Sequence, residues 1–246
     1  MNNNNCIIEV RELTKKFGDF IAVDKISFNI RKGEIIGFIG ANGAGKTTAI
    51  RMLCGLLKPT SGNAMIAGFD IYKETEKIKR NIGYMSQKFS LYDDLTIDEN
   101  IRFYAGIYGL SKLEIRNKAE RLIKKLNLDK EKRSLLKSIP LGWKQKIAFS
   151  IALIHNPSIV FLDEPTAGVD PITRRQFWEM IYESANSGTT IIVTTHYMDE
   201  AEYCDRVMIM AQGKISAIGM PKELKNQFNA LTMDEVFVSV ARGGTK

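Results

Sequence analysis

Residues 35–53 place a short apolar run, a glycine-rich loop and a helix-forming segment in direct succession. The run Ile35–Ile39 is rich in β-branched and aromatic residues and is bounded by glycines, which predicts a buried strand. The loop Gly40–Thr47 fits the pattern G-x-x-x-x-G-K-[ST], in which glycines let successive backbone N–H groups approach an anion closely. We therefore expect this loop to bind phosphate groups.

The helix expected after the loop serves the same site. It runs from Lys46 to about Leu53 and points the positive end of its dipole at the anion. We expect Lys46 to reach the β- and γ-phosphates and Thr47 to offer a hydroxyl to a magnesium ion. A glycine-rich turn with a solvated lysine is the alternative, and the strand–loop–helix context disfavours it. The residues predicted to bind the nucleotide here are Gly40, Asn42, Gly43, Ala44, Gly45, Lys46, Thr47 and Thr48.

The composition is that of a globular protein without a membrane span. The chain has 246 residues, of which 44% are hydrophobic, enough for one large domain with a substantial core. The longest uncharged stretch, Ile147–Leu162, is too short to cross a bilayer comfortably and is interrupted by an Asn-Pro pair. The N-terminal asparagine run lacks the features of a signal peptide, and the three cysteines are far apart. These features predict a cytoplasmic protein with reduced thiols.

The net charge of +7 leaves the nature of the partner open. It is compatible with nucleic acid, an anionic membrane surface or a nucleotide substrate. The basic stretch 110–133 carries apolar residues at helical spacing, namely Ile115, Leu122, Ile123 and Leu126. This spacing favours a solvated helix face over a nucleic-acid surface or a docking face.

The order of predicted elements indicates an α/β fold. Residues 6–30 alternate apolar and polar positions around Gly18-Asp19, which predicts an antiparallel strand pair. Further strands are expected at Ile82–Met85, Ile159–Leu162 and Thr190–Thr195, and a hairpin is expected from Val207–Met210 and Lys214–Ile218. Helices are expected at Thr96–Leu128, which has a break near Gly109, and at Leu141–Ile154 and Ile172–Ser187. We expect a mainly parallel core, an N-terminal antiparallel β part and an inserted helical subdomain.

Two acidic residues follow the predicted strand Ile159–Leu162. Asp163 and Glu164 stand at its carboxyl end, where open α/β sheets place their ligands. Asp163 is suited to hold magnesium through its water shell, and Glu164 to orient and polarise the water that attacks a γ-phosphate. Because adjacent strand residues point to opposite faces, we expect the chain to leave strand geometry at Pro165. A turn with two solvated acids is the alternative.

The two histidines receive different interpretations. His196 ends the strand Thr190–Thr195, a position from which it can donate a hydrogen bond to a γ-phosphate. A purely structural role is the alternative for His196. His155 stands at a helix end before Asn156-Pro157, and for it we expect the structural role.

These motifs follow one another in a fixed order: Gly40–Thr48, Gln87 after "NIGYM", "SIPLGWKQK", "FLDEP", "AGVD" and His196. Over nearly the whole chain, the order resembles the ATP-binding subunits of ABC transporters. The resemblance implies a P-loop NTPase core that binds ATP and magnesium. It also implies a role for individual residues: Phe17 stacks on adenine, with a core phenylalanine as the alternative. Thr47, Gln87 and Asp163 bind magnesium, and Gln87 also links to the membrane partner. Asp170 joins the two halves of a dimer, and Lys46, Glu164 and His196 are catalytic.

One motif departs from the family pattern. Residues 139–143 occupy the places of Leu-Ser-Gly-Gly-Gln, so the serine hydroxyl and the first glycine are missing. Proline suits the first position of a helix, and the backbone amides of Leu141, Gly142 and Trp143 remain available to an anion at that helix start. We expect a weakened but functional signature, in which Pro140, Leu141 and Gly142 contact the nucleotide.

The resemblance also implies how the protein works. Two copies sandwich two ATP molecules, each site formed by the phosphate loop of one copy and the signature of the other. The stretches "TTHYMDEAEYCDR" and "LYDDLTIDENIRFYAGIYGL" are similar to the branch that serves bacterial multidrug exporters with a separate permease. This implies an ATPase that forms an ATP-dependent homodimer, lies peripherally on the cytoplasmic face of the inner membrane, partners integral permease subunits and binds no nucleic acid.

Two rival functions stay open at this point. The first is a soluble ATPase of the same fold that acts on ribosomes or DNA. The second is an ATP-binding module that does not hydrolyse ATP, suggested by the altered signature. The expected domain division is a disordered tail at 1–6, a nucleotide-binding domain at 7–230 with a helical subdomain at about 88–156, and a short C-terminal tail at 231–246.

Overall fold

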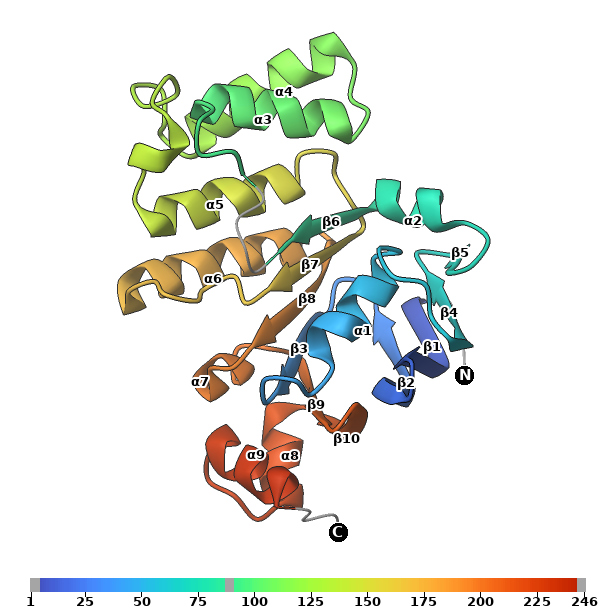
Figure 1. Cartoon of the computed structure of the whole chain (residues 1–246). Helices are drawn as coiled ribbons and strands as arrows, with labels where there is room; N and C mark the ends of the chain where they lie inside the picture. The colour runs from blue at the N-terminus through green and yellow to red at the C-terminus, as the bar shows by residue number, and fades with distance from the viewer. Residues whose placement is uncertain (1–4, 87–90, 243–246) are drawn as a thin grey trace.

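The computed structural model describes residues 5–86 and 91–242, which form two β-sheets and the helices around them (Figure 1). The smaller sheet is antiparallel with the order β2-β1-β4-β5. Its strands are β1 (Cys6–Phe17), β2 (Phe20–Arg31), β4 (Ser61–Ile66) and β5 (Phe69–Asp70). The tight turn between Phe17 and Phe20 confirms the predicted antiparallel pair. The sequence pattern does not predict β4, which pairs along the other side of β1.

The larger sheet carries the phosphate loop and has the order β10-β9-β3-β8-β7-β6. Its strands are β3 (Ile35–Gly40), β6 (Ile82–Met85), β7 (Ile159–Asp163), β8 (Thr190–Thr195), β9 (Arg206–Ala211) and β10 (Lys214–Gly219). All neighbours are parallel except the edge hairpin of β9 and β10. This confirms the predicted mainly parallel core and brings the carboxyl ends of β3, β7 and β8 side by side.

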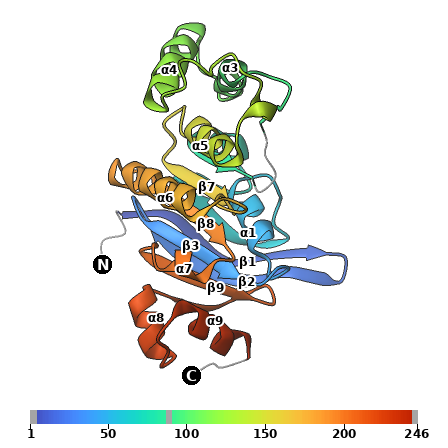
Figure 2. The same cartoon turned by 90° about the vertical axis from the view of Figure 1, so that its left-hand side faces the viewer.

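Alternate residues of β3 supply two separate hydrophobic cores. Ile36 and Phe38 pack with α1 (Lys46–Leu53) and the antiparallel sheet. Ile35 and Ile39 belong to the opposite core, which includes residues of α5 (Leu141–Ala152) and α6 (Pro171–Asn186). Figures 1 and 2 show α1 on one face of the sheet and α5 with α6 on the other. A strand buried on both faces explains why its sequence is continuously apolar.

The helical subdomain lies at one end of the molecule. It contains α3 (Ile97–Ile107), α4 (Lys112–Lys125) and the short η2 (Leu136–Ser138), and α5 joins it to the sheet. Both α3 and α4 begin with capping boxes, Thr96 with Glu99 and Ser111 with Glu114. Gly109 between them has φ +79°, which confirms the predicted break. Another helix, α2 (Thr75–Asn81), precedes β6.

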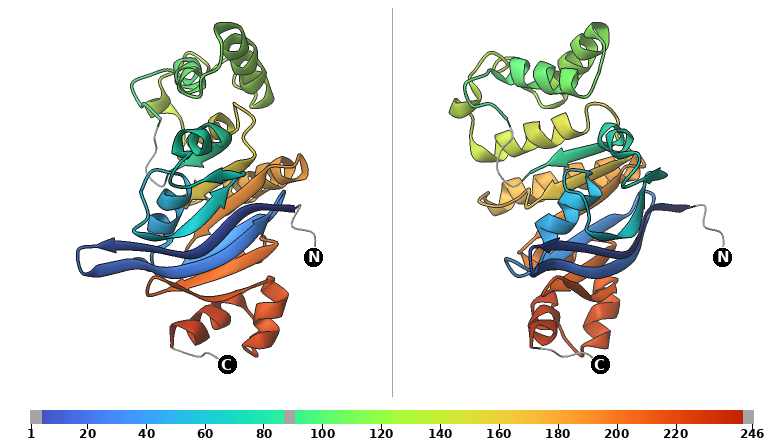
Figure 3. Two further views of the ribbon diagram at one scale, coloured as in Figure 1. Left: turned by 90° about the vertical axis from the view of Figure 1, so that its right-hand side faces the viewer. Right: turned by 45° about the vertical axis from the view of Figure 1, so that its right-hand side comes forward.

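Three helices near the C-terminus are not predicted by the sequence pattern. They are α7 (Met198–Ala201), α8 (Pro221–Gln227) and α9 (Met233–Ala241). Helix α9 lies in the segment expected to be a short tail, and it buries Met233, Val236 and Val240 in the main core. Figure 3 shows α8 and α9 at the end opposite the helical subdomain, with the β1–β2 hairpin projecting from the body between them. None of the helices within residues 5–86 and 91–242 has the length and apolar character needed to cross a membrane.

Candidate functional site

The loop after β3 closes around its own lysine. The Nζ of Lys46 donates hydrogen bonds to the carbonyls of Gly40, at 2.7 Å, and Ala41, at 3.2 Å. The Lys46 side chain is buried, and burial lowers its pKa, while the nearby charges of Glu164 and Asp163 act in the opposite direction. The loop thus holds a cation in its interior, at the N-terminus of α1, where Thr47 and Thr48 form the first turn.

Glycine is required at the junction of the loop and α1. Gly45 has φ +102°, and a Cβ there would lie 2.5 Å from the carbonyl oxygen of Ala22 in β2. The β9–β10 hairpin supports the loop from the same side: the N–H of Gly213 donates to the carbonyl of Ala44 at 3.1 Å. The backbone of the loop is therefore fixed by two neighbouring strands rather than by its own sequence alone.

Asp163 is a buried carboxylate next to the helix that follows the loop. Its Oδ1 accepts a hydrogen bond from the hydroxyl of Thr194 at 2.6 Å. Burial raises the pKa of Asp163, whereas the hydrogen bonds with Thr194 and Thr47 lower it. The contact with Thr47 joins the end of β7 to the start of α1, so two of the three residues predicted to serve magnesium lie together.

Glu164 directly follows Asp163, the last residue of β7, and turns towards the phosphate loop. Its backbone has φ +51°, a left-handed conformation that is uncommon for a residue with a side chain. The chain was expected to leave strand geometry at Pro165, and this prediction is wrong by one residue because the chain leaves it at Glu164. The N–H of Glu164 donates to the carbonyl of Thr194 at 3.1 Å and to its hydroxyl at 2.9 Å. These bonds to β8 hold the strained turn.

His196 lies beside Glu164 in the lining of a small cavity. The Nδ1 of His196 lies 3.4 Å from an Oε2 of Glu164. The cavity has a volume of about 250 Å³ and is lined by Gly40, Ala41, Asn42, Glu164, His196, Met198 and Phe237. The phosphate loop, the acidic residue and the histidine thus meet at the carboxyl edge of β3, β7 and β8, as predicted from the strand order.

Several residues that shape this site were not predicted. The hydroxyl of Thr194 donates a hydrogen bond to the Asp163 carboxylate and accepts one from the N–H of Glu164. The sequence feature that could have indicated this role is the threonine pair at the end of β8. Phe237 comes from α9, more than seventy positions beyond Glu164 in the sequence, and no local pattern places it at the cavity.

The signature lies elsewhere in the chain. Among the described residues that line the cavity, none comes from 139–143. Pro140 is the N-cap of α5 rather than its first helical residue, and its carbonyl accepts the N–H of Trp143 at 3.0 Å. The expectation that the Trp143 amide is available to an anion is therefore wrong. Gly142 packs closely on α6, since a Cβ there would lie 2.3 Å from Thr173.

Asp170 caps the helix next to the signature. Its Oδ1 accepts the backbone N–H of Thr173 at 3.0 Å, and Pro171 occupies the first turn of α6. Hydrogen bonding with Thr173 lowers the pKa of Asp170, which is exposed. The residue therefore has a structural role within one chain in addition to any contact between chains.

Phe17 lies at the tip of the β1–β2 hairpin and is 51% exposed. This exposure excludes the alternative of a core phenylalanine. The ammonium of Lys15 lies 5.1 Å from the centre of its ring, a cation–π distance. An exposed aromatic face next to a cation is suited to stack on a nucleobase.

The donor set at Asp163 fits magnesium. Its carboxylate and the Thr47 hydroxyl supply the hard oxygen atoms that this ion prefers, whereas Gln87 lies outside the described residues. Within the described parts of the chain, no group of three or more His, Cys, Asp or Glu residues is placed to hold a metal. A magnesium ion here would thus complete its coordination with phosphate oxygens and water.

His155 has the structural role that the sequence predicts. Its Nε2 lies 3.0 Å from the carbonyl oxygen of Ile82, and its ring stacks on Tyr108 with 3.8 Å between centres. Burial lowers the pKa of His155 to about 4. The residue therefore stays neutral at physiological pH and packs the helical subdomain against β6.

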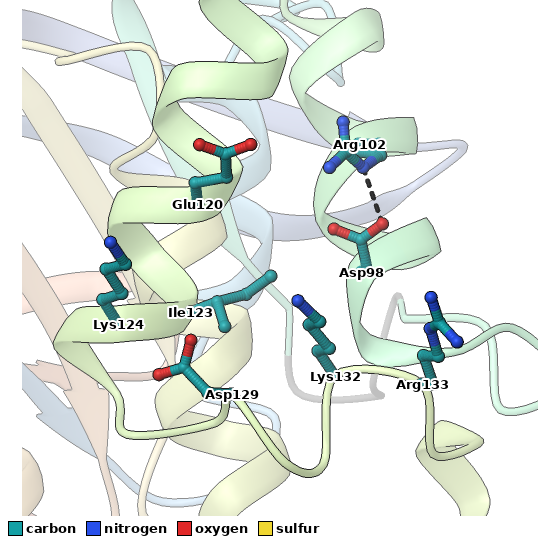
Figure 4. A pocket seen from close by; sticks show the side chains of 8 residues that line it. All are labelled: Asp98, Arg102, Glu120, Ile123, Lys124, Asp129, Lys132 and Arg133. Carbon is teal, nitrogen blue, oxygen red and sulfur yellow. Dashed lines mark hydrogen bonds and ion pairs between the residues drawn. The ribbon is translucent and has the colours of Figure 1, made fainter.

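A second cavity, of about 420 Å³, lies between α3, α4 and the loop that follows α4 (Figure 4). Charges of both signs line it, together with the apolar Ile123: Asp98, Arg102, Glu120, Lys124, Asp129, Lys132 and Arg133. Arg102 donates to Asp98 at 2.6 Å. The charged residues of α4 are largely exposed, and Leu122, Ile123 and Leu126 are buried, whereas Leu113 is 69% exposed. The predicted helical spacing is confirmed, and the solvated face stays a prediction.

A match to a known family covers most of the residues described above. Residues 23–167 match the family described as ABC transporter, which is more than half of the chain. The chain belongs to the ABC transporter family. As a member, it carries an ABC ATPase domain, whose characteristic nucleotide is ATP.

Two relatives and one solved structure illustrate what the chain is similar to. It is 49% identical, over 90% of its length, to "Probable multidrug ABC transporter ATP-binding protein YbhF" of Escherichia coli, of which it spans 38%. It is 36% identical, over 95% of its length, to the "Linearmycin resistance ATP-binding protein LnrL" of Bacillus subtilis, of which it spans 75%. A solved dimer of the ATP-binding cassette MJ0796 with ADP and Pi is 26% identical, with a TM-score of 0.77 over 87% of this chain and 98% of that one.

Proposed function

We propose that this ABC protein binds and hydrolyses ATP to drive export of a substrate through a separate membrane permease. The observation that carries the proposal is the approach of Glu164 to His196, at 3.4 Å, on the rim of the phosphate loop. A carboxylate and an imidazole side by side at a γ-phosphate position form an arrangement suited to orient an attacking water. The same pair argues against a module that binds ATP without hydrolysing it.

Each residue of the site has a distinct task in this proposal. Lys46 and the loop amides hold the β- and γ-phosphates, for which the Lys46 ammonium exchanges its bonds to the loop carbonyls. Glu164 accepts a proton from the attacking water and orients it, and His196 contacts the γ-phosphate. Magnesium, when bound by Thr47, Asp163 and Gln87, neutralises phosphate charge. Phe17 stacks on the adenine.

The separation of signature and phosphate loop supports an ATP-bound homodimer. Within one chain, residues 139–143 do not line the cavity at Glu164, so we expect a second copy to supply them. The backbone amides of Leu141 and Gly142 at the start of α5 are suited to contact the partner's γ-phosphate. The dimeric MJ0796 structure with ADP and Pi is consistent with such a pairing.

Glu164→Gln tests the hydrolysis part of the proposal. The variant keeps the shape of the side chain but removes the proton acceptor, so it should bind ATP, stop turning it over and accumulate as a dimer. Size-exclusion chromatography with light scattering in ATP and magnesium reports the dimer, and phosphate release reports turnover. Wild-type turnover by the variant would show that Glu164 does not have this role.

The permease is proposed to dock in a groove beside β6. The groove, about 390 Å³, is lined partly by Leu56, Tyr84 and Ile107, and Ile107 is 62% exposed. It borders β6, whose last residue, Met85, comes two positions before Gln87 in the sequence, the residue that the family resemblance links to the membrane partner. This contact would hold the protein on the cytoplasmic face of the inner membrane. YbhF is named as a probable multidrug transporter protein, and LnrL as a linearmycin resistance protein. For this chain, these names favour export of drug-like compounds over action on ribosomes or DNA.

Copurification tests the partner. The tagged protein is expressed at native level, membranes are solubilised gently, and copurifying proteins are quantified by mass spectrometry. A multi-spanning protein in near-equal amount supports the proposal, and its loss in Ile107→Asp, with ATP binding retained, places the contact in the groove. Recovery of ribosomal or DNA-bound partners alone would favour the soluble rival.

A further inference from the structure

A fully buried carboxylate behind the catalytic pair has no role in the function proposed so far. Glu200 lies on α7, and its side chain is 0% exposed. A carboxylate removed from water is costly unless it is paired and hydrogen-bonded. The partners that Glu200 finds therefore indicate what it does.

Glu200 binds the two segments that present the catalytic pair. Its Oε1 accepts the hydroxyl of Thr166 at 2.6 Å, and its Oε2 accepts the hydroxyl of Thr195 at 2.6 Å. Thr166 is two residues beyond Glu164, and Thr195 immediately precedes His196. One carboxylate thus joins the turn after β7 to the end of β8, with both threonines buried.

The charge of Glu200 is balanced from a third segment. The Nε of Arg174, on α6, lies 3.6 Å from Oε1 of Glu200, and the guanidinium stacks on Tyr197 at 4.1 Å from its ring centre. The N–H of Tyr197 donates to the Thr195 hydroxyl at 3.0 Å, so that hydroxyl is fixed on both sides. Arg174 lies one turn beyond Asp170, the residue implied in the dimer contact.

We propose that Glu200 is a positioning residue that holds Glu164 and His196 at hydrolysis distance and ties both to the start of α6. Glu164 has a left-handed backbone conformation, which persists only when surrounding contacts stabilise it. Its hydrogen bonds to Thr194 involve only the backbone N–H of Glu164. The Thr166–Glu200–Thr195 bridge, called the Glu200 clamp below, fixes the far end of the same turn. This inference rests on the proposed ATP hydrolysis.

The test compares Thr166→Val with Thr166→Ser in the complete chain, assembled with its permease. Valine keeps the shape but removes the hydroxyl, whereas serine keeps the hydroxyl. With the Glu200 clamp acting on the catalytic step, valine should lower kcat about tenfold or more while KM for ATP stays within twofold, and serine should restore kcat to within about twofold of wild type. Glu200→Gln, as a second variant, should lower kcat in the same way.

Glu202→Gln is the matched control. Glu202 is a partly exposed carboxylate two residues along from Glu200, and it pairs with Lys225 on α8 at 2.7 Å. Its loss should leave kcat and KM within twofold of wild type. Thermal unfolding and ATP affinity of every variant are measured alongside, so that loss of folded protein is separated from loss of turnover.

The outcomes separate the Glu200 clamp from the proposed function. A Thr166→Val enzyme with wild-type kcat would overturn the clamp, as would a serine variant that is as slow as the valine variant. Equal loss of activity in the Glu202→Gln control would overturn it too. By contrast, a wild-type complex without ATPase activity would overturn the proposed function itself, whatever the clamp variants do.

Discussion

Replacing Pro140 by serine tests whether the altered signature weakens the ATP-bound dimer. Pro140 is the N-cap of α5, with φ −56° and ψ 148°, and α5 begins without a side-chain cap. Serine adopts this extended conformation readily and places a hydroxyl at the helix start. If the signature faces the γ-phosphate of the partner copy, that hydroxyl gains a hydrogen bond to a charged group.

The magnitudes separate the two effects of this change. A serine cap stabilises a helix by roughly 0.5–2 kcal/mol, whereas the loss of proline costs about 0.4–1 kcal/mol through the unfolded chain. The stability of the single chain should therefore change by between about −0.5 and +1.6 kcal/mol. A hydrogen bond to a charged group contributes about 1.5–3 kcal/mol, and it occurs twice in a symmetric dimer. The dimer dissociation constant should then fall by roughly 10²–10⁴.

Sedimentation velocity in ATP and magnesium measures this constant, on a Glu164→Gln background that prevents turnover. Pro140→Ala is the matched control, because it removes the ring without adding a hydroxyl, and it should dimerise no more tightly than the parent. If the serine and alanine variants dimerise equally well, the hydroxyl makes no contact with phosphate, and the reasoning about the signature is refuted.

Two further predictions concern single residues of the site. Asp163→Asn should stabilise the nucleotide-free protein at pH 7 by roughly 0.5–2 kcal/mol in urea unfolding, while abolishing magnesium-dependent stabilisation by ATP. The reason is that burial raises the pKa of Asp163, so the folded protein binds this proton more tightly than the unfolded chain does. The stability of the wild-type protein therefore falls as the pH rises above 3.8, the ordinary pKa of an aspartate. A variant no more stable than wild type would contradict this. Phe17→Ala should weaken ATP binding by the loss of about 1–3 kcal/mol of stacking, with an unchanged unfolding midpoint because the ring is half exposed, and Phe17→Trp should retain binding. Calorimetric titration checks this, and equal affinity in the alanine variant would exclude adenine stacking on Phe17.

The local structure of the site was predictable from the sequence. The phosphate loop, the strand before it and the helix after it are specified by neighbouring residues: apolar β-branched positions, glycines that permit a positive φ, and a lysine at the helix start. Strand periodicity also placed Asp163, Glu164 and His196 at strand ends. Parallel strands end at one edge of a sheet, so these residues were expected to converge, and they do.

Backbone detail at single residues was less predictable. The turn after β7 begins at Glu164 instead of Pro165, because the N–H of Glu164 donates hydrogen bonds to Thr194 of β8 and these bonds hold a left-handed residue that local preference disfavours. Likewise, the position of Pro140 as an N-cap depends on how α5 meets α6 at Gly142. In both cases a contact from another element decides between conformations of similar local energy.

Long-range partners were decided by the tertiary structure alone. The Glu200 clamp joins Thr166 to a residue 34 positions away, and Phe237 reaches the cavity from a helix that no local signal connects with it. The sequence by itself determined which segments become strands and helices and which motifs bind phosphate, because those properties depend on neighbours along the chain. Only the fold decided which buried polar groups pair and which helices line the cavity, since these depend on the order of strands in the sheet and on packing across it.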